Sequence, residues 1–436
     1  MRDLVLLAVL IGVAPLILRA PMVGLLTWIW TSVMAPQREI YGPLRDANLN
    51  FFIAALTVVA WLLSKDRKTA PLNPVIALLV VFAAWTTLTT LGAIDRDYSL
   101  PLWSRTMKSI ALVLAVAVLA NTRLRIQAVL WMVVVSIGYY GVRGGLFVIG
   151  TGGSHQVFGP DDTMIGDNNN LGLALAAILP LILYLKNTSR VQATRLAALA
   201  TLILSVVAVF GTYSRGALVA LAAVVAGYAM KSRAGVLLVL VAASIATASP
   251  HVMPQQWLAR MSTIRTAEAD QSFAGRVAAW KTSYAIAIHR PLGGGFAAVQ
   301  LDDVAHAFPT EGGLTAGRAA HSIYFEALGD HGFVGLALYL SIFVAAWLNA
   351  SRVQSLAHQR PDLAWANQLA RMLQVSILAF LVGGAALSMA YYDGMLILLA
   401  LTAALLQVAT APRAAEAGQS APAWRLALDR PAGSSG

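Results

Sequence analysis

Long apolar stretches with few or no charged residues recur along the whole chain, and they limit its possible folds more than any other feature. They cover residues 4–18, 21–35, 49–63, 72–91, 106–120, 127–149, 171–185, 196–211, 216–230, 234–249, 322–349, 372–390 and 394–410. A helix needs about 20 apolar residues to cross the hydrocarbon core of a bilayer. Backbone groups cannot stay unpaired in hydrocarbon, and these runs lack the alternation of barrel strands. The sequence therefore predicts an all-α, polytopic integral membrane protein.

The composition excludes several other classes of protein. Hydrophobic residues make up 58% of the 436 residues and charged residues only 12%, whereas a soluble domain has about 25% charged residues. A soluble enzyme and a disordered chain are therefore excluded. Because the chain has no cysteine, disulfide-stapled folds, cysteine nucleophiles, iron–sulfur clusters and cysteine-bound zinc are excluded as well.

The loop charges fall into two classes that indicate an orientation. The net charge is +11, and one set of loops carries most of the basic residues: Lys65, Arg67, Lys68, Arg123, Arg125, Lys186, Arg190, Arg195, Lys231, Arg233, Arg352, Arg360 and Arg371. By the positive-inside rule these loops are expected in the cytoplasm. The long segment 250–320 is then expected on the opposite face, the periplasmic side of a bacterial inner membrane.

The first 35 residues interrupt this regular alternation. Pro21 separates two apolar runs that are each short for a span, so 1–35 is expected to make one net crossing through a broken or re-entrant element. The total is then about twelve crossings, with both ends in the cytoplasm. The predicted parts are transmembrane helices (1–249), a periplasmic segment with a surface helix (250–320), C-terminal transmembrane helices (321–410) and a disordered cytoplasmic tail (411–436).

Charged residues at the ends of spans are candidates for function, because charge is costly near the membrane interior. Ser214-Arg215-Gly216 opens a span at its outer end. Ser214 is expected to cap that helix, which puts Arg215 in the first turn beside free backbone N–H groups, and Asp167 is expected to cap another span. A helix N-terminus and a guanidinium together can bind phosphate. An arginine that reaches lipid headgroups explains the same pattern.

Residues 273–289 have the apolar spacing of a helix that lies on or near the membrane surface. Arg276 falls in its first turn and is a candidate for a second phosphate contact. The run from Pro291 to Gly295 is then expected to make a sharp turn. Arg265 is a third candidate cation in a less regular stretch, where a solvated loop charge is the simpler interpretation.

His321 stands where the long segment re-enters the membrane. Its side chain titrates near neutral pH and can act as a general base, although an ordinary interfacial histidine fits the position as well. Glu326 and Asp330 follow it four residues apart, so they share one helix face. At least one of these two carboxylates is expected to meet a cation or water.

Three further features complete the set of candidates. Arg143 lies among glycines inside a span, where close helix packing is expected to bring it an acidic group or a ligand phosphate. Asp393, between the last two spans, is a candidate partner for one of the arginines. The pattern Asp95-Arg96-Asp97 is of a type that holds a divalent ion, but a paired loop is the simpler interpretation. Neither a metal nor a cofactor is expected.

Taken in order, these motifs resemble the O-antigen ligase/O-antigen polymerase family of bacterial membrane glycosyltransferases, and the ligase branch in particular. The similar segments cover roughly residues 160–335 and are Asp167 to Leu171, Tyr213-Ser214-Arg215-Gly216, Gly275-Arg276 with Trp280, Pro291 to Phe296, and His321-Ser322 followed by Asp330 to Gly335. The stretch from Met1 to Pro36, with Trp28 and Trp30, is similar to the O-glycosylation ligases associated with exosortase systems.

The resemblance implies a GT-C-like fold and transfer of a glycan from undecaprenyl pyrophosphate to an acceptor, without metal or nucleotide. It implies that Arg215 and Arg276 bind the pyrophosphate and that His321 activates the acceptor hydroxyl. Many members of the family have Glu at the position of Asp330, so Glu326 is an alternative helper.

Three functions are compatible with these features. The first is an O-antigen ligase that passes the glycan to lipid A–core oligosaccharide in lipopolysaccharide maturation, or to a protein. The second is a polymerase that uses the same donor. The third, from a different class, is a lipid-linked sugar flippase, which is expected to have charges along a path through the membrane and not at one rim.

Overall fold

The computed structural model describes residues 2–66, 71–230, 254–255, 257–258, 271–309 and 316–411. Its long elements in these ranges are helices, as the sequence predicted: α1 (Arg2–Arg19), α2 (Pro21–Ile29), α3 (Leu49–Leu63), α4 (Pro74–Leu91), α5 (Arg96–Leu119), α6 (Arg123–Gly150), α7 (Asn168–Thr188), α8 (Gln192–Gly211), α9 (Arg215–Ala229), α12 (Gln271–His289), α13 (Asp302–Ala307), α14 (Ile323–His358), α15 (Ala364–Gly384) and α16 (Asp393–Thr410). Short helical turns are η1 (Trp30–Met34), η2 (Pro36–Glu39), η3 (Pro43–Arg45), η5 (Ala298–Gln300) and η6 (Pro361–Leu363). The predicted span 234–249, the candidate Arg265 and the tail 412–436 lie outside the described residues.

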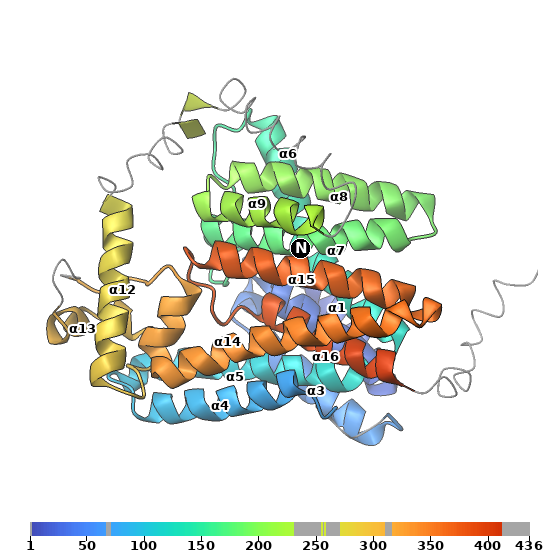
Figure 1. Ribbon diagram of the computed structural model, residues 1–436. Helices are drawn as coiled ribbons and strands as arrows, with labels where there is room; N and C mark the ends of the chain where they lie inside the picture. Colours follow the sequence, from blue (N-terminus) through green and yellow to red (C-terminus); the bar gives the residue numbers. More distant parts are fainter. Residues whose placement is uncertain are drawn as a thin grey trace, which may run out of the picture.

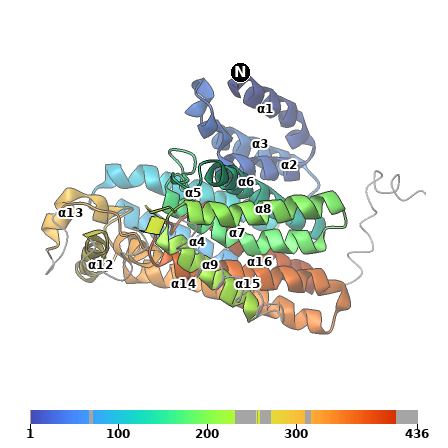
Figure 2. The same cartoon turned by 90° about the horizontal axis from the view of Figure 1, so that it is seen from above.

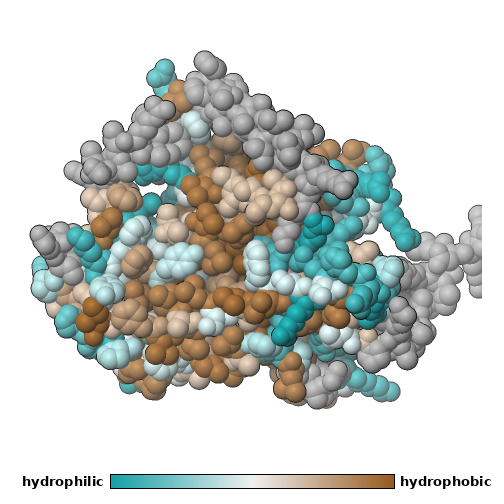
Figure 3. Space-filling model, in the orientation of Figure 1, coloured by the Kyte–Doolittle hydropathy of each residue, from teal (hydrophilic) through white to brown (hydrophobic). Residues whose placement is uncertain are grey.

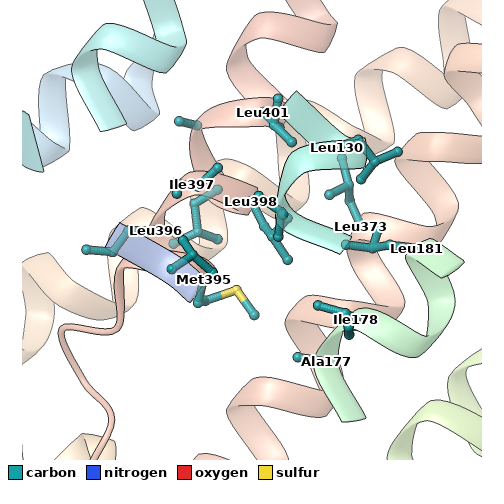
Figure 4. Close-up of a cluster of buried hydrophobic side chains, with 14 of the residues drawn as sticks. Leu130, Ala177, Ile178, Leu181, Leu373, Met395, Leu396, Ile397, Leu398 and Leu401 are labelled. Carbon is teal, nitrogen blue, oxygen red and sulfur yellow. The ribbon is translucent and has the colours of Figure 1, made fainter. Parts of the chain in front are cut away.

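The centre of the bundle is formed by α6, α7, α15 and α16. Leu130, Leu181, Leu373 and Leu398, one from each of these helices, point toward one another and are at most 2% exposed (Figure 4). Helices that are apolar all round belong inside a bundle or in a membrane. Lipid tails are as apolar as leucine, so close van der Waals packing is what favours these contacts inside a bilayer.

Eight helices in the described ranges are long and apolar enough to cross a membrane, judged by length and composition: α4, α5, α6, α7, α8, α14, α15 with the turn before it, and α16. Three shorter apolar helices are Pro21–Met34, Leu49–Leu63 and Arg215–Ala229. Hydrophobic residues occupy the middle of the face in Figure 3, and most hydrophilic ones lie toward the two ends of the helices. The expected multi-pass membrane protein is confirmed, whereas the count of about twelve crossings stays a prediction.

The N-terminal helices form a separate layer on one side of the bundle. Figure 2 shows α1, α2 and α3 together on the side away from α14 and α15. The predicted break is present, because Ala20 has an extended backbone (φ −145°, ψ 103°) and Pro21 begins α2. The Tyr140 hydroxyl donates to the carbonyl of Met34 at 2.6 Å, which joins this layer to α6. Whether residues 1–35 cross a membrane once stays a prediction.

Loops of the predicted basic class meet at the end of the bundle where α3, α5 and α16 end and α6 and α15 begin. Arg125 donates to Asp66 at 2.8 Å, Arg123 lies over the ring of Trp365, and Arg360 donates to the carbonyl of Ala409 at 3.0 Å. The described part of the segment before α14, with α12 and α13, lies at the other end (Figure 1). The two charge classes are thus separated along the bundle, and the assignment of either end to the cytoplasm stays a prediction.

Four predicted helix boundaries are wrong by more than five residues. Helix α14 continues to His358, beyond 349, and α15 begins at Ala364, before 372. The stretch predicted to begin at 106 is part of α5, which already begins at Arg96 because the Asp95 side chain caps it by accepting from the N–H of Tyr98 at 2.9 Å. The stretch predicted to run to 390 ends at Gly384. Residues 385–392, called here the α15–α16 loop, follow a Gly-Gly pair, and glycine is a poor helix former.

Helix α12 crosses the ends of the bundle helices instead of running along them (Figure 1). It spans Gln271–His289, which confirms the helix predicted over 273–289. Its aromatic residues pack on α14: the rings of Trp280 and Phe325 are stacked at 5.1 Å, and those of Tyr284 and Phe333 meet edge to face at 6.0 Å. The position of α12 relative to a membrane surface stays a prediction.

Glycines allow α6 and α8 to approach closely, as the sequence predicted around Arg143. A Cβ added at Gly145 would collide with the carbonyl oxygen of Leu204, and one added at Gly141 would collide with the Ser205 hydroxyl. The collision at Gly145 is with backbone, which has little freedom to move. Gly145 is therefore a fixed point of helix–helix packing.

We expect Gly145→Ala to lower the free energy of unfolding by about 1–3 kcal/mol, because the added methyl forces two packed helices apart. The matched control is Gly150→Ala in the same helix, where an added Cβ meets no atom within 4 Å. Thermal unfolding of both purified variants in detergent measures the difference. Equal melting temperatures for the two variants would contradict the packing role of Gly145.

Candidate active site

The helices α7, α9 and α14 all begin at one end of the bundle, and the caps of the first two are as predicted. The Asp167 carboxylate accepts from the N–H groups of Asn169 and Asn170 at 2.8 and 3.4 Å. The Ser214 hydroxyl accepts from the N–H of Ala217 at 3.2 Å, which places Arg215 in the first turn of α9. Helix N-termini carry a partial positive charge and favour anions.

The α15–α16 loop connects these helix N-termini. The N–H of His321 donates to the Ser388 hydroxyl at 2.9 Å, and the Asn170 side chain donates to the Ser388 carbonyl at 3.5 Å. The neighbouring Leu387 packs on α9, since a Cβ at Gly216 would lie 3.3 Å from its side chain. Two adjacent loop residues therefore hold His321 close to the first turn of α9. Most of this loop was predicted to belong to the span 372–390, and Ser388 was not among the predicted site residues.

Helix α12 brings Arg276 to the same place. Trp280 donates from its indole N–H to the carbonyl of Ala320 at 2.8 Å, directly before His321. Arg276 is four residues before Trp280, so both lie on one face of the helix. Arg276 and Arg318 act electrostatically on the imidazole of His321. The structure thus brings together Arg276 and His321, and it adds Arg318, which the sequence analysis did not select.

The charge state of His321 follows from this environment. Burial lowers the pKa of His321 below its ordinary value of 6.5, and the positive charges of Arg276 and Arg318 lower it further, while Asp167 opposes them. The imidazole is therefore neutral at pH 7. A neutral imidazole is the form that accepts a proton.

Two residues at the site have left-handed backbone conformations, which are uncommon for side chains other than glycine. His321 has φ 46° and Tyr213, just before the cap of α9, has φ 56°. The Tyr213 hydroxyl donates to the carbonyl of Gly153, which helps to hold its segment in place. Such conformations persist where the surrounding contacts enforce them, and they cluster at functional sites.

Glu326 and Asp330 hold loops in place. The Glu326 carboxylate accepts from the N–H of Ala390 at 3.0 Å. The two Asp330 carboxylate oxygens accept from the Tyr391 hydroxyl and from the N–H of Ala297, each at 2.9 Å. The sequence analysis expected a cation or water at one of these carboxylates. In the described part of the chain, both are bound by neutral N–H and O–H donors and neither forms an ion pair.

The glycine-rich run docks on a break in α14. The break is at Gly332 (φ 69°, ψ −173°), and the N–H groups of Gly294 and Gly295 donate to the carbonyls of Gly329 and Asp330 at 2.8 and 3.0 Å. Gly293 has φ 73°, and a Cβ there would collide with backbone of residues 330–332. Glycine is required at this close approach. The predicted sharp turn is confirmed, and its partner is the Asp-His-Gly segment.

His331 is a fully buried residue of this junction that the sequence analysis did not select. Its Nδ1 lies 2.7 Å from the Thr89 hydroxyl, and its carbonyl accepts from the indole of Trp85 at 3.0 Å. The ring of Phe296 meets the imidazole edge to face at 4.6 Å. The junction is thereby joined to α4.

The remaining candidates lie apart from His321 or outside the described chain. Arg143 forms an ion pair with Glu39 at 2.7 Å, which is the acidic partner that close packing was expected to provide. Asp393 interacts electrostatically with Arg105 of α5, an arginine that the sequence analysis passed over. Arg265 is not among the described residues. Asp95 is a helix cap, and among the described residues no group of three or more His, Asp or Glu side chains is placed to hold a metal.

The comparison with protein families agrees with this geometry. Residues 200–340 match the O-antigen ligase family, and this range includes Arg215, Arg276 and His321. The matched segment covers less than half of the chain, and it is similar to that family. Residues 1–190 match a family of unknown function, DUF5935. Comparison with curated proteins gave no match. The α15–α16 loop lies beyond the segment matched to the O-antigen ligase family, although it holds the His321 backbone.

We expect Asp330→Ala to lower the free energy of unfolding by about 2 kcal/mol or more, because it leaves the Tyr391 hydroxyl and the Ala297 N–H buried without an acceptor. Tyr391→Phe removes one donor and leaves the carboxylate bonded to Ala297, so its loss is smaller. Denaturant unfolding in detergent measures both. A larger loss for Tyr391→Phe than for Asp330→Ala would contradict this account of the junction.

Proposed function

We propose that the protein is an O-antigen ligase: a metal-independent, inverting glycosyltransferase that moves a glycan from undecaprenyl pyrophosphate to lipid A–core oligosaccharide. The observation that carries this proposal is the convergence of Arg276 and His321 near the first turn of α9, where Arg215 begins the helix, within a segment that matches the O-antigen ligase family. The basic class of loops supports an inner-membrane location with this end of the bundle in the periplasm.

In the proposed reaction the acceptor hydroxyl oxygen bonds to the anomeric carbon of the donor sugar. The bond from that carbon to the pyrophosphate oxygen breaks, its electron pair stays on the leaving group, and the hydroxyl proton passes to the imidazole of His321. One displacement inverts the anomeric centre. A general base contributes about 10²–10⁴ in rate.

The two arginines are suited to the leaving group. Negative charge grows on the pyrophosphate as the bond breaks, and fixed guanidinium groups stabilise that charge without reorganising. Arg215 lies at the N-terminus of α9, where the free backbone N–H groups also favour an anion. Removal of one such positioned hydrogen-bond donor lowers the rate by about 10²–10³. A lipid pyrophosphate also provides an activated donor in a compartment without ATP.

We expect His321→Ala and Arg215→Ala to abolish transfer, because they remove the base and a leaving-group contact. The measurement is complementation of a strain that lacks its O-antigen ligase, with lipopolysaccharide examined on a gel and expression checked by immunoblot. Wild type restores O-antigen-capped lipopolysaccharide, and the control Arg352→Gln, an exposed arginine near the C-terminal end of α14, restores it equally.

Full capping by a normally expressed His321→Ala variant would refute the proposed base. If wild type restores no capping, the same strains are examined for glycan chain length and for glycosylated protein. These readouts separate the polymerase and the protein O-glycosylation ligase, which use the same donor.

The pH dependence of transfer provides a second test. His321 works as a base when neutral, and its pKa is lowered, so kcat/KM is expected to be constant above about pH 6.5 and to fall at lower pH. Asp167→Asn keeps a good helix cap but removes the charge that raises this pKa. The decrease of kcat/KM on the acid side, called here the acid limb, then moves to lower pH. Arg276→Gln removes a charge that lowers the pKa, so the limb moves to higher pH. Shifts of the same sign in the two variants would contradict the role of His321.

A further inference from the structure

Arg318 lies against the glycine that precedes Arg276. A Cβ added at Gly275 would lie 2.5 Å from Cζ and 3.1 Å from Nε of Arg318, and closer still to Nη1. The guanidinium therefore occupies the space that any other residue at 275 would fill. Gly275 is inside α12, where alanine is the better helix former, so helix formation does not account for a glycine at this position. A side chain at 275 would displace the Arg318 guanidinium from this space.

The backbone around Arg318 is fixed on both sides. The N–H of Gly317 donates to the Asp302 carboxylate at 2.7 Å, and the N–H of Arg318 donates to the carbonyl of Val299 at 3.0 Å. Two residues later the carbonyl of Ala320 accepts from Trp280. Arg318 is three residues from His321, which is at most about 11 Å even in an extended chain. Its backbone is therefore held near the proposed base.

Arg318 follows Gly317, whose N–H donates to the Asp302 carboxylate, but Arg318 forms no ion pair with that carboxylate or with another described one. Its guanidinium forms no ion pair or side-chain hydrogen bond with a described residue. Arg318 contacts α12 at Gly275, the residue before Arg276, and the positive charges of both arginines act on His321. An anion bound next to His321 is attracted by both positive charges. A group with two negative charges, such as a pyrophosphate, matches this arrangement.

We propose that Arg318 is a third pyrophosphate-binding arginine of this site, seated by Gly275 beside Arg276. This inference rests on the proposed function. It adds Arg318 to the donor site and assigns Gly275 the role of leaving space for its guanidinium. Arg276 comes from α12 and Arg318 from the segment that leads into α14. The two guanidinium groups therefore approach the pyrophosphate from different elements, which fixes its orientation toward His321.

Binding of undecaprenyl pyrophosphate to the purified full-length protein in detergent tests the proposal, with undecaprenol as the uncharged probe. Wild type is expected to bind the pyrophosphate lipid more tightly. Arg318→Gln removes one charge-assisted contact and is expected to weaken that binding roughly 10- to 100-fold, while binding of undecaprenol is unchanged. Arg318→Lys keeps the charge without the fork and is expected to bind with intermediate affinity. Arg352→Gln is the control.

Gly275→Ala tests the contact between Gly275 and the Arg318 guanidinium. The added methyl meets the end of a flexible side chain, so the protein is expected to fold normally while the guanidinium moves away from its position. Gly275→Ala is then expected to weaken pyrophosphate binding in the same direction as Arg318→Gln. In the Arg318→Gln background, Gly275→Ala is expected to cause no further loss, because the group that it displaces is already absent.

The outcomes separate this proposal from the proposed function. If wild type does not prefer undecaprenyl pyrophosphate over undecaprenol, the proposed function fails. If wild type has that preference and Arg215→Ala reduces it, but Arg318→Gln and Gly275→Ala leave it unchanged, only the role of Arg318 is overturned. Equal loss of undecaprenol binding in Arg318→Gln would also overturn it, since that result indicates a general structural defect.

Discussion

The hydrogen bonds of two carboxylates on α14 hold the rest of the candidate site in place. Asp330 bonds the α15–α16 loop through Tyr391 and the glycine-rich run through Ala297, and Glu326 bonds the same loop through Ala390. That loop in turn accepts the N–H of His321 on the Ser388 hydroxyl. The left-handed backbone of His321 is thus maintained by contacts that begin several residues further along α14.

Carboxylates are a costly choice for this task inside an apolar bundle, unless every oxygen finds donors. The break at Gly332 lets residues 293–297 approach the helix, so that the N–H of Ala297 donates to Asp330, and the α15–α16 loop provides the donors Tyr391 and Ala390. Because these donors are neutral, no cation has to be buried in the bundle beside Glu326 or Asp330. The arginines therefore stay at the rim of the bundle, where a substrate can reach them.

The sequence predicts those parts of the site that depend on local chemistry. The caps formed by Ser214 and Asp167 and the helix that carries Arg276 follow from short patterns. The α15–α16 loop was not predicted in this way, because residues 372–390 are uncharged and mostly apolar. Bonds from Ala390 to Glu326 and from Tyr391 to Asp330 hold this loop in place. Arg318 lies in a stretch without periodicity, and its place beside Gly275 depends on two segments more than forty residues apart.

In the proposed reaction, the arginines near His321 also affect the strength of the base. In the absence of donor their positive charges lower the pKa of the imidazole, which keeps it neutral but weakens it as a base. A bound pyrophosphate compensates those charges, so the pKa of His321 rises toward its ordinary value. The base then becomes stronger when the donor is present. In the proposed reaction, activation of the acceptor hydroxyl is thus coupled to occupation of the donor site through the charges of these arginines.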